Sequence, residues 1–304
     1  MTGTVYTEMQ GTMGNIGTVA VYNTLDTLYD GSTIANNSGG EPTAIPDLSY
    51  EELLKVHDIY YHPSNAVMVL YGDLDYTKFL KQFNEVLDNY ERKEITIDYE
   101  MDKLNEGFIE KRFDFPVDQT ANTKNSAILG YAWRMNTASV REDLGMSILA
   151  TYLNNSASEF QKAFSQSGIG SSIGISYDIS YEQPMLLFQV VNVDESKKDS
   201  LKQFVDEQME VLIQNKLDQK LLDSIIASVE FSNALITEQS NIGFSLAMSI
   251  GTLWNIDKED YYFNFNTYLN EIKDKAKEGY LEDLAKKYIV DNQNRALVST
   301  VLRN

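Results

Sequence analysis

The sequence predicts an α+β fold, built from helices and antiparallel strands in two related units. Three observations lead to this prediction. The first 90 residues alternate helix, strand and helix, and residues 108–193 contain most of the predicted strands before a long run of helices. In addition, two distant stretches, residues 50–70 and 280–300, carry the same order of elements. Strands and helices that are segregated along a chain in this way are typical of α+β domains.

The first unit opens with an amphipathic helix at residues 5–15, VYTEMQGTMGN, which runs into a glycine-flanked turn. This helix carries one carboxylate, Glu8, on a face otherwise lined by Val5, Met9 and Thr12. No strand or cap precedes the helix, so we expect the chain to begin inside a domain. The irregular pattern that follows leaves the order of residues 1–35 undecided.

The clearest element of the first unit is a helix at residues 49–61. Ser49 and Glu52 fit a capping box, and apolar residues recur behind them at helical spacing until Pro63 ends the helix. The apolar run AVMVLYG, residues 66–72, is predicted to be a buried strand. Residues 76–90 then return to a helical pattern.

Residues 93–107 are charged and lack an apolar stripe, which indicates a linker between a first domain of residues 1–92 and a second of residues 108–304. We expect the strands at residues 108–115 and 125–135 to be neighbours in one antiparallel sheet. After two helices, the second of them stopped by Gly168, come two strands around Glu182-Gln183-Pro184, a run of helices at 197–290 and a last strand.

The two units resemble each other when residues 50–70 are aligned with residues 280–300. In YEELLKVHDIYYHPSNAVMVL and YLEDLAKKYIVDNQNRALVST, Glu52 matches Glu282, Leu54 matches Leu284 and Ile59 matches Ile289. Each stretch runs from a helix through a polar turn into an apolar strand. Repeated units of this size are whole domains, so a duplication would mean that the second unit has a full set of strands and that the first lacks its opening half.

The composition excludes several classes of function. Lys and Arg number 25 against 45 Asp and Glu, which gives a net charge of −20 and argues against nucleic acid as a ligand. The absence of cysteine excludes disulfides, thiolate zinc sites and thiol catalysis. The sequence shows neither a membrane span nor a signal peptide, so we expect no membrane association and a cytoplasmic location.

The residues that usually perform catalysis are few. The only histidines are His57 and His62, and a spacing of five places them roughly 140° apart on a helix. We interpret both as structural, with one packing on the helix and the other serving the turn. The glycine-containing segments at 167–174 and 38–42 are interpreted as turns, since neither fits a phosphate loop or a serine nucleophile elbow.

A family resemblance covers nearly the whole chain. Residues 38–75, SGGEPTAIPDLSYEELLKVHDIYYHPSNAVMVLYGDLD, resemble the pitrilysin (insulin-degrading enzyme) family of zinc metallopeptidases, in its presequence-protease and falcilysin-like subfamily. The matching motifs are the Ser-Gly-Gly-x-Pro turn, Tyr-Tyr-His-Pro-Ser-Asn-Ala at 60–66 and Tyr-Gly-Asp at 71–73. Residues 229–254 are similar to the second domain of that family.

The resemblance implies repeated α+β domains, each with an antiparallel sheet and helices packed on one face, of which the first is truncated here. It also implies a zinc site in which the two histidines of an H-x-x-E-H motif bind the metal and its glutamate activates water. A distant glutamate in a Tyr/Phe-x-Glu-Met-x-Gly segment is the third ligand. That segment is Tyr6 to Gly11 here, so the resemblance assigns Glu8 as a metal ligand.

The sequence departs from this pattern because it contains no H-x-x-E-H motif. A catalytic zinc site typically uses three protein ligands, so we expect no catalytic residue and no bound zinc in this chain alone. Our leading hypothesis is part of a zinc-dependent peptidase that hydrolyses short unfolded peptides, with an N-terminal half-domain and C-terminal domains as missing partners.

Two other hypotheses stay open at this stage. The chain could be a catalytically dead scaffold or peptide-binding subunit, or a separate polypeptide could supply H-x-x-E-H in trans. The absent half-domain also predicts self-association through residues 1–90, because uncovered apolar surface and unpaired strand edges promote it.

Overall fold

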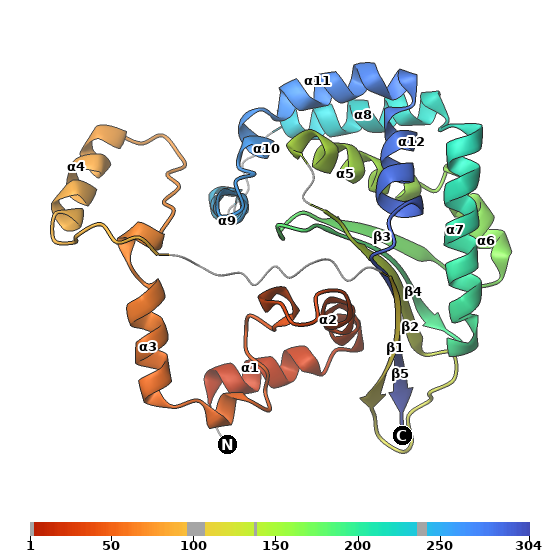
Figure 1. Cartoon of the computed structure of the whole chain (residues 1–304), viewed down its shortest axis with the longest axis horizontal. Coiled ribbons are helices and arrows are strands. Elements are labelled where there is room, and N and C mark those ends of the chain that lie inside the picture. The colour runs from red at the N-terminus through yellow and green to blue at the C-terminus, as the bar shows by residue number, and fades with distance from the viewer. Residues whose placement is uncertain (1–2, 96–106, 137–138, 236–241) are drawn as a thin grey trace.

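The structure, a computed structural model, describes residues 3–95, 107–136, 139–235 and 242–304 (Figure 1). It combines one five-stranded sheet with helices, which confirms the predicted α+β class. Most of the linker expected at residues 93–107 lies outside the described residues. Among the described helices, none is long and apolar enough to cross a membrane.

The sheet lies at the centre of residues 108–304. Its strands are β1 (Phe108–Pro116), β2 (Ala127–Arg134), β3 (Ile173–Asp178), β4 (Met185–Val193) and β5 (Arg295–Arg303), in the order β1-β5-β2-β4-β3. The expectation that β1 and β2 are neighbours is wrong, because β5 inserts between them. Strand β5 pairs parallel with β1 and antiparallel with β2, and the other pairs are antiparallel.

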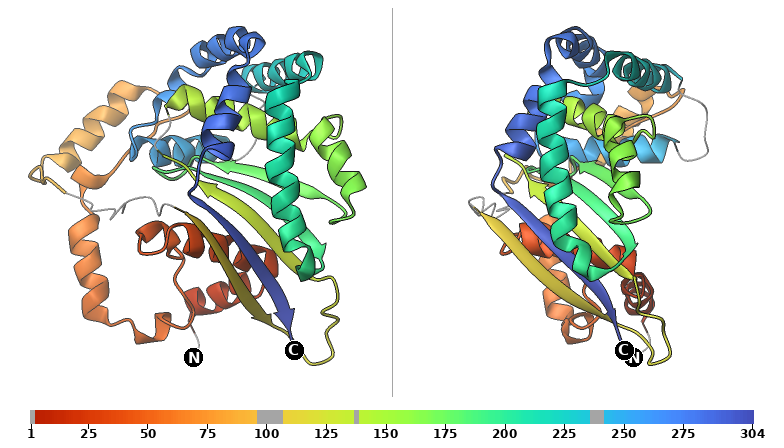
Figure 2. Two further views of the ribbon diagram at one scale, coloured as in Figure 1. Left: turned by 45° about the vertical axis from the view of Figure 1, so that its right-hand side comes forward. Right: turned by 90° about the vertical axis from the view of Figure 1, so that its right-hand side faces the viewer.

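One face of the sheet is covered by helices from its own unit (Figures 1 and 2). In chain order the helices of this unit are α5 (Val140–Asn154), α6 (Glu159–Ser167), α7 (Lys198–Asn215), α8 (Gln219–Ala234), α9 (Ile242–Trp254), α10 (Asp260–Phe263), α11 (Phe265–Lys275) and α12 (Tyr280–Ala285), which continues as the π-helix Lys286–Val290. Side chains from α5, α6, α7, α8, α11 and α12 join alternate residues of the strands, such as Tyr131 and Trp133, in the larger core.

The opposite face is covered by a helix from the first unit. After α1 (Thr4–Met13) comes α2 (Ile16–Leu28), for which the sequence had given no clear pattern. Leu25, Leu28 and Tyr29 pack in a second core with the strand residues that point away from the first, including Ala132 and Val298. The order of this segment, undecided from sequence, therefore comes from long-range packing.

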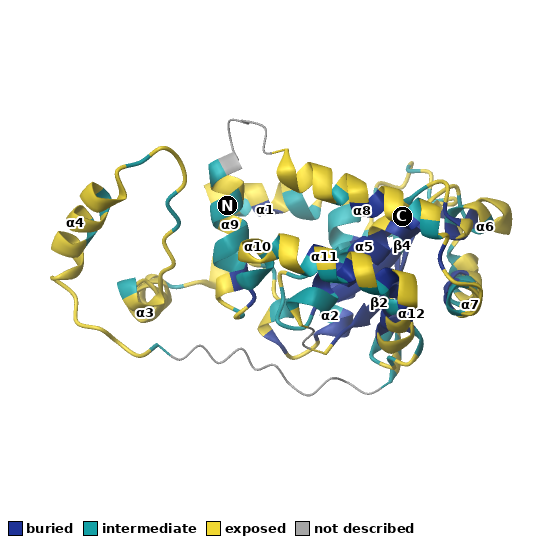
Figure 3. Ribbon diagram, turned by 90° about the horizontal axis from the view of Figure 1, so that it is seen from above, coloured by how far each residue is buried: buried dark blue, intermediate teal, exposed yellow. Residues whose placement is uncertain are grey.

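From residue 50 on, the first unit stands apart from both cores (Figure 3). It contains α3 (Tyr50–Tyr60), which begins at the expected Ser49–Glu52 capping box, and α4 (Tyr76–Leu87). Short 3-10 turns occur at Thr33–Ala35, Ile45–Asp47 and Pro63–Asn65 in the first unit, and at Glu195–Lys197 and Ala276–Glu278 in the second unit. Residues 66–72 were predicted to be a buried strand, and this prediction is wrong. They form no strand, and most of them are exposed, because no described strand lies beside them.

Candidate functional site

The residue that the resemblance assigns to metal binding, Glu8, lies in the middle of α1. Its side chain is exposed, whereas the next residue, Met9, is buried. Its main-chain carbonyl accepts a hydrogen bond from the Thr12 hydroxyl at 3.1 Å, one turn further along the helix. Helix α1 thus directs a carboxylate to solvent while Met9 fixes the helix against the protein.

Met9 packs on the Ser-Gly-Gly turn, so two motifs of the resemblance meet in space. A Cβ atom on Gly39 would lie 2.4 Å from Met9 Sδ and 2.9 Å from Met9 Cε, so a side chain here would require the end of the Met9 side chain to move. The next residue, Gly40, has a φ of +97°, a conformation that favours glycine. The sequence interpretation of this segment as a turn is confirmed. Gly39 allows the close approach of Met9, and Gly40 adopts the positive φ.

Asn37 stabilises this turn from within. Its side-chain oxygen accepts the Gly39 N–H at 3.1 Å, and its amide group donates to Met13 Sδ at 3.7 Å. The turn is therefore tied to both the middle and the end of α1.

A cleft of about 1020 Å³ opens beside this pair of motifs. Residues of α1, of the segment after it and of the Ser-Gly-Gly turn line one side, and the end of β1 with the loop that follows lines the other, including Gln10, Met13, Glu41, Asp114 and Asp118. Hydrogen bonds from Arg303 and then Arg112 hold the pKa of Asp114 below its usual value. The Asp114 carboxylate in this cleft is thus ionised at neutral pH.

The described residues do not form a complete metal site. No group of three or more His, Cys, Asp or Glu side chains within residues 3–95, 107–136, 139–235 and 242–304 is placed to hold a metal ion. A catalytic zinc ion typically needs three protein ligands. Glu8 can supply one carboxylate, and the donor set around it among the described residues does not fit zinc.

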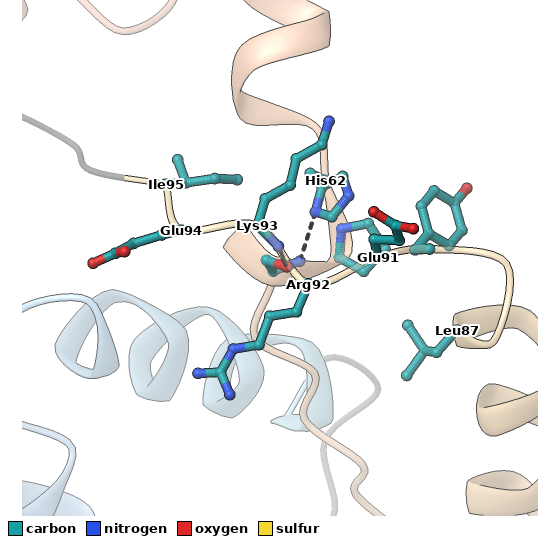
Figure 4. Close-up of a pocket in the computed structure, with 10 residues that line it drawn as sticks. His62, Leu87, Glu91, Arg92, Lys93, Glu94 and Ile95 are labelled. Carbon is teal, nitrogen blue, oxygen red and sulfur yellow. Dashed lines mark hydrogen bonds between the residues drawn. The ribbon is translucent and has the colours of Figure 1, made fainter.

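The two histidines have local structural roles. The His57 ring stacks on Tyr61 with 4.9 Å between centroids. His62 precedes the 3-10 turn after α3, where its Nδ1 accepts the Ser64 N–H at 3.1 Å (Figure 4). It also lines a cavity of about 840 Å³ with Leu87 and residues 90–95. Packing on the helix and serving the turn are the roles expected from the sequence.

Sequence reasoning missed the polar cluster that fixes α2 to the sheet. The Arg134 guanidinium lies 4.9 Å from the centre of the Tyr29 ring, and it donates to the Leu28 carbonyl at 3.1 Å. The Tyr29 hydroxyl donates to the Gln183 carbonyl at 2.7 Å. Burial raises the pKa of Tyr29, and the Arg134 charge opposes that rise. An arginine that ends the fully buried strand AILGYAWR was the available signal.

Comparisons with known proteins agree with this architecture. Residues 47–229 match the family described as Peptidase M16 inactive domain. Protein HypA of Clostridium perfringens is 30% identical over 303 residues, which cover 98% of this chain and 31% of that protein. The mitochondrial presequence protease of Schizosaccharomyces pombe is 28% identical, with 96% of this chain and 30% of that protein covered.

A solved structure shows the same fold. The crystal structure of a protease from Helicobacter pylori superposes with a TM-score of 0.76 over 99% of this chain and 70% of that chain, at 16% identity. The fold and the sequence match together define a peptidase-type α+β protein. The chain belongs to the M16 peptidase family. It spans about three tenths of the length of the relatives it matches in sequence.

Proposed function

We propose that this chain is the part of a zinc-dependent M16 peptidase that contributes the outlying glutamate ligand, Glu8. Together with polypeptide outside these residues it hydrolyses short unfolded peptides, and the chain alone is inactive. The supporting observation is the packing of Met9 on Gly39, which places the Glu8 side chain in solvent on a helix fixed by the Ser-Gly-Gly turn. An exposed carboxylate on a fixed helix is suited to complete a site whose other ligands come from elsewhere.

The internal repeat supports the proposal that polypeptide outside these residues completes the first unit. Leu54 and Ile59 of α3 are each 44% exposed, whereas their counterparts in the second copy, Leu284 and Ile289, are 2% and 1% exposed. The second copy packs these side chains against the sheet core, and the described part of the first copy has no sheet of its own. Supplying that sheet would give the α3 residues the surroundings that their counterparts have.

The test is a chimera in which this chain replaces the matched portion of the Clostridium perfringens protein. We expect the chimera to cleave a fluorogenic peptide when zinc is present, and Glu8→Gln to abolish cleavage. Asp274→Asn, which removes an exposed carboxylate on α11 away from the cleft, serves as the matched control and should cleave normally. The proposal fails if Glu8→Gln leaves cleavage in the folded chimera unchanged, or if the chain alone cleaves the peptide with zinc.

The exposed apolar surface favours a second candidate, a peptide-binding subunit without catalysis. Of the 26 exposed large hydrophobic side chains among the described residues, 16 lie within residues 48–90. Such a concentration exceeds the scattered apolar residues of an ordinary surface and marks an interaction site. Peptide binding by the folded chimera without turnover would favour this candidate over the peptidase.

A further inference from the structure

The turns that follow the two repeated helices share one hydrogen bond. After α3, His62 Nδ1 accepts the Ser64 N–H at 3.1 Å. After the helix at 280–290, Asn292 Oδ1 accepts the Asn294 N–H at 2.9 Å. The alignment of residues 50–70 with 280–300 sets positions 62 and 64 against 292 and 294, so His62 and Asn292 occupy the same place in the two copies.

Asn292 uses its other end to join the turn to the sheet. Its Nδ2 donates to the Arg134 carbonyl at 3.0 Å and to the Tyr288 carbonyl at 3.3 Å. Arg134 is the last residue of β2, which pairs antiparallel with β5. The Arg134 N–H in turn donates to the Asn294 carbonyl at 3.0 Å. One side chain therefore connects the helix, the turn and the neighbouring strand.

His62 has a donor available for the same purpose. Because Nδ1 accepts a backbone N–H it carries no proton, and the neutral imidazole therefore has its proton on Nε2. Among the described residues, no hydrogen bond leaves Nε2, although the ring is half-buried and lies 5.6 Å from the Tyr90 ring, edge to face. In both copies, therefore, a planar side chain, the His62 imidazole or the Asn292 amide, accepts a hydrogen bond at one atom and has a hydrogen-bond donor at another.

The segment after His62 also lacks, among the described residues, the neighbouring strands that its counterpart in the second copy has. Residues 66–72 correspond to 296–302 in β5, which has a strand on each side. Val67 is 39% and Met68 51% exposed, whereas Leu297 and Val298 are 0% and 2% exposed. The apolar pattern of a central strand is thus present in both copies and is covered only in the second.

We propose that His62 is a positioning residue, whose Nε2 donates to the main-chain carbonyl at the end of a strand that pairs antiparallel with residues 66–72. That strand belongs to the polypeptide that completes the peptidase, so this inference rests on the proposed function. It follows that His62 does not bind metal, because both ring nitrogens are used in hydrogen bonds. Residues 66–72 become a strand only when the partner strand is present.

The equivalence of His62 and Asn292 is tested first in the chain itself. Asn292→His keeps an acceptor and a donor, whereas Asn292→Leu removes both. We expect hydrogen exchange of amides 296–302 in Asn292→His to stay within about threefold of the wild type, and in Asn292→Leu to be faster by about tenfold or more, since a lost buried hydrogen bond exposes its partners. Exchange in Asn292→His as fast as in Asn292→Leu would overturn the equivalence.

The docking role is tested in the chimera described above. We expect amides 66–72 to exchange rapidly in the chain alone and slowly in the chimera. His62→Asn should preserve the slow exchange and His62→Leu should lose about tenfold of it. Wild-type protection in His62→Leu would contradict the docking role, and protection that arises in the chain alone as its concentration increases would assign the site to a second copy.

These outcomes are separable from those of the proposed function. Glu8→Gln should abolish cleavage by the chimera and leave the protection of amides 66–72 intact. Failure of cleavage with protected amides would therefore contradict the peptidase and not the role of His62. If the chimera does not fold, the exchange rates of the two Asn292 variants still decide whether the equivalence holds.

Discussion

The ammonium group of Lys258 lies 2.8 Å from the carboxylate of Asp143, with side chains only 5% and 1% exposed. The Tyr177 hydroxyl donates to the same carboxylate at 2.6 Å. Lys258 also closes α9, because its N–H donates to the Leu253 carbonyl at 2.8 Å after Asp257 has turned to a φ of +56°. Burial raises the pKa of Asp143, and the Lys258 charge opposes that rise. This ion pair fixes the end of α9 to α5 and β3.

Removing one partner of this pair should be costly. We expect Asp143→Ala to lower the free energy of unfolding by about 3–5 kcal/mol, because it leaves the Lys258 charge buried and unpaired. The double variant Asp143→Leu/Lys258→Met should cost less. Urea denaturation measures both. Glu230→Ala, which breaks a half-exposed ion pair with Lys273, is the control and should change the free energy of unfolding by less than about 1 kcal/mol. If Asp143→Ala has no larger effect than Glu230→Ala, the buried pair does not stabilise the fold as argued.

The packing of Met9 on Gly39 predicts a steric effect. Gly39→Ala should destabilise the protein by about 1–3 kcal/mol, since the new methyl group overlaps Met9. Gly11→Ala is the control: its Cβ meets nothing within 4 Å, and alanine favours a helix. Met9→Ala/Gly39→Ala should relieve the overlap, so the coupling measured by a double-mutant cycle should differ clearly from zero. Additive effects would show that the two residues do not press on each other.

The raised pKa of Tyr29 predicts how the free energy of unfolding decreases at alkaline pH. Burial raises the pKa of Tyr29 above its usual value of 10.0, so the folded protein holds a proton that the unfolded chain releases. This contribution is complete below pH 10 and is lost as pH rises, by about 1.4 kcal/mol per pH unit. Tyr29→Phe should have a shallower decline between pH 9 and 11, as measured by denaturant titrations, and parallel declines would count against the assignment.

The repeat provides a matched pair of truncations. Leu284→Ala should lower the free energy of unfolding by about 2–5 kcal/mol, because Leu284 lies in the core. Leu54→Ala, at the same position of the first copy, should change it by no more than about 0.5 kcal/mol in the chain alone. A comparable loss for Leu54→Ala would mean that α3 is packed in solution.

The exposed surface of residues 48–90 should make the isolated chain associate with itself. Light scattering should give a mass above that of the 34.5 kDa chain, because contiguous apolar surface is rarely left in water. Leu54→Glu/Val67→Glu should shift the mass toward the monomer. A monomeric wild type at concentrations where it is folded would remove this prediction.

Local sequence patterns were sufficient to predict those elements whose tertiary contacts favour the same structure as the local pattern. The capping box at Ser49 places the start of α3 correctly, and the Glu182-Gln183-Pro184 turn lies between β3 and β4 as expected. Residues 66–72 have the apolar pattern of a strand and still form none, because a strand needs neighbours that the described residues do not provide. Helix α2 was missed although Asn15 caps it by accepting the Thr18 N–H, since its buried face is defined by a sheet far along the chain.

The candidate site was predictable only in part. Glu8 is assigned to the site only through the resemblance of its segment to a known motif, and nothing in its local spacing distinguishes it from any exposed glutamate. The contact of Met9 with Gly39 joins two segments that are well separated along the chain, so it required the structure. The hydrogen bond that His62 and Asn292 have in common was not predictable because the two side chains differ, and it required the structure.

The position of β5 also governs the order in which the second unit can fold during synthesis. Its nine residues are translated after β1 to β4 and nevertheless occupy the place between β1 and β2. The edges of β1 and β2 that pair with β5 therefore remain unpaired until residues 295–303 leave the ribosome. This interval is when the nascent chain is most exposed to wrong strand pairing, and a chaperone would have the greatest effect on its yield.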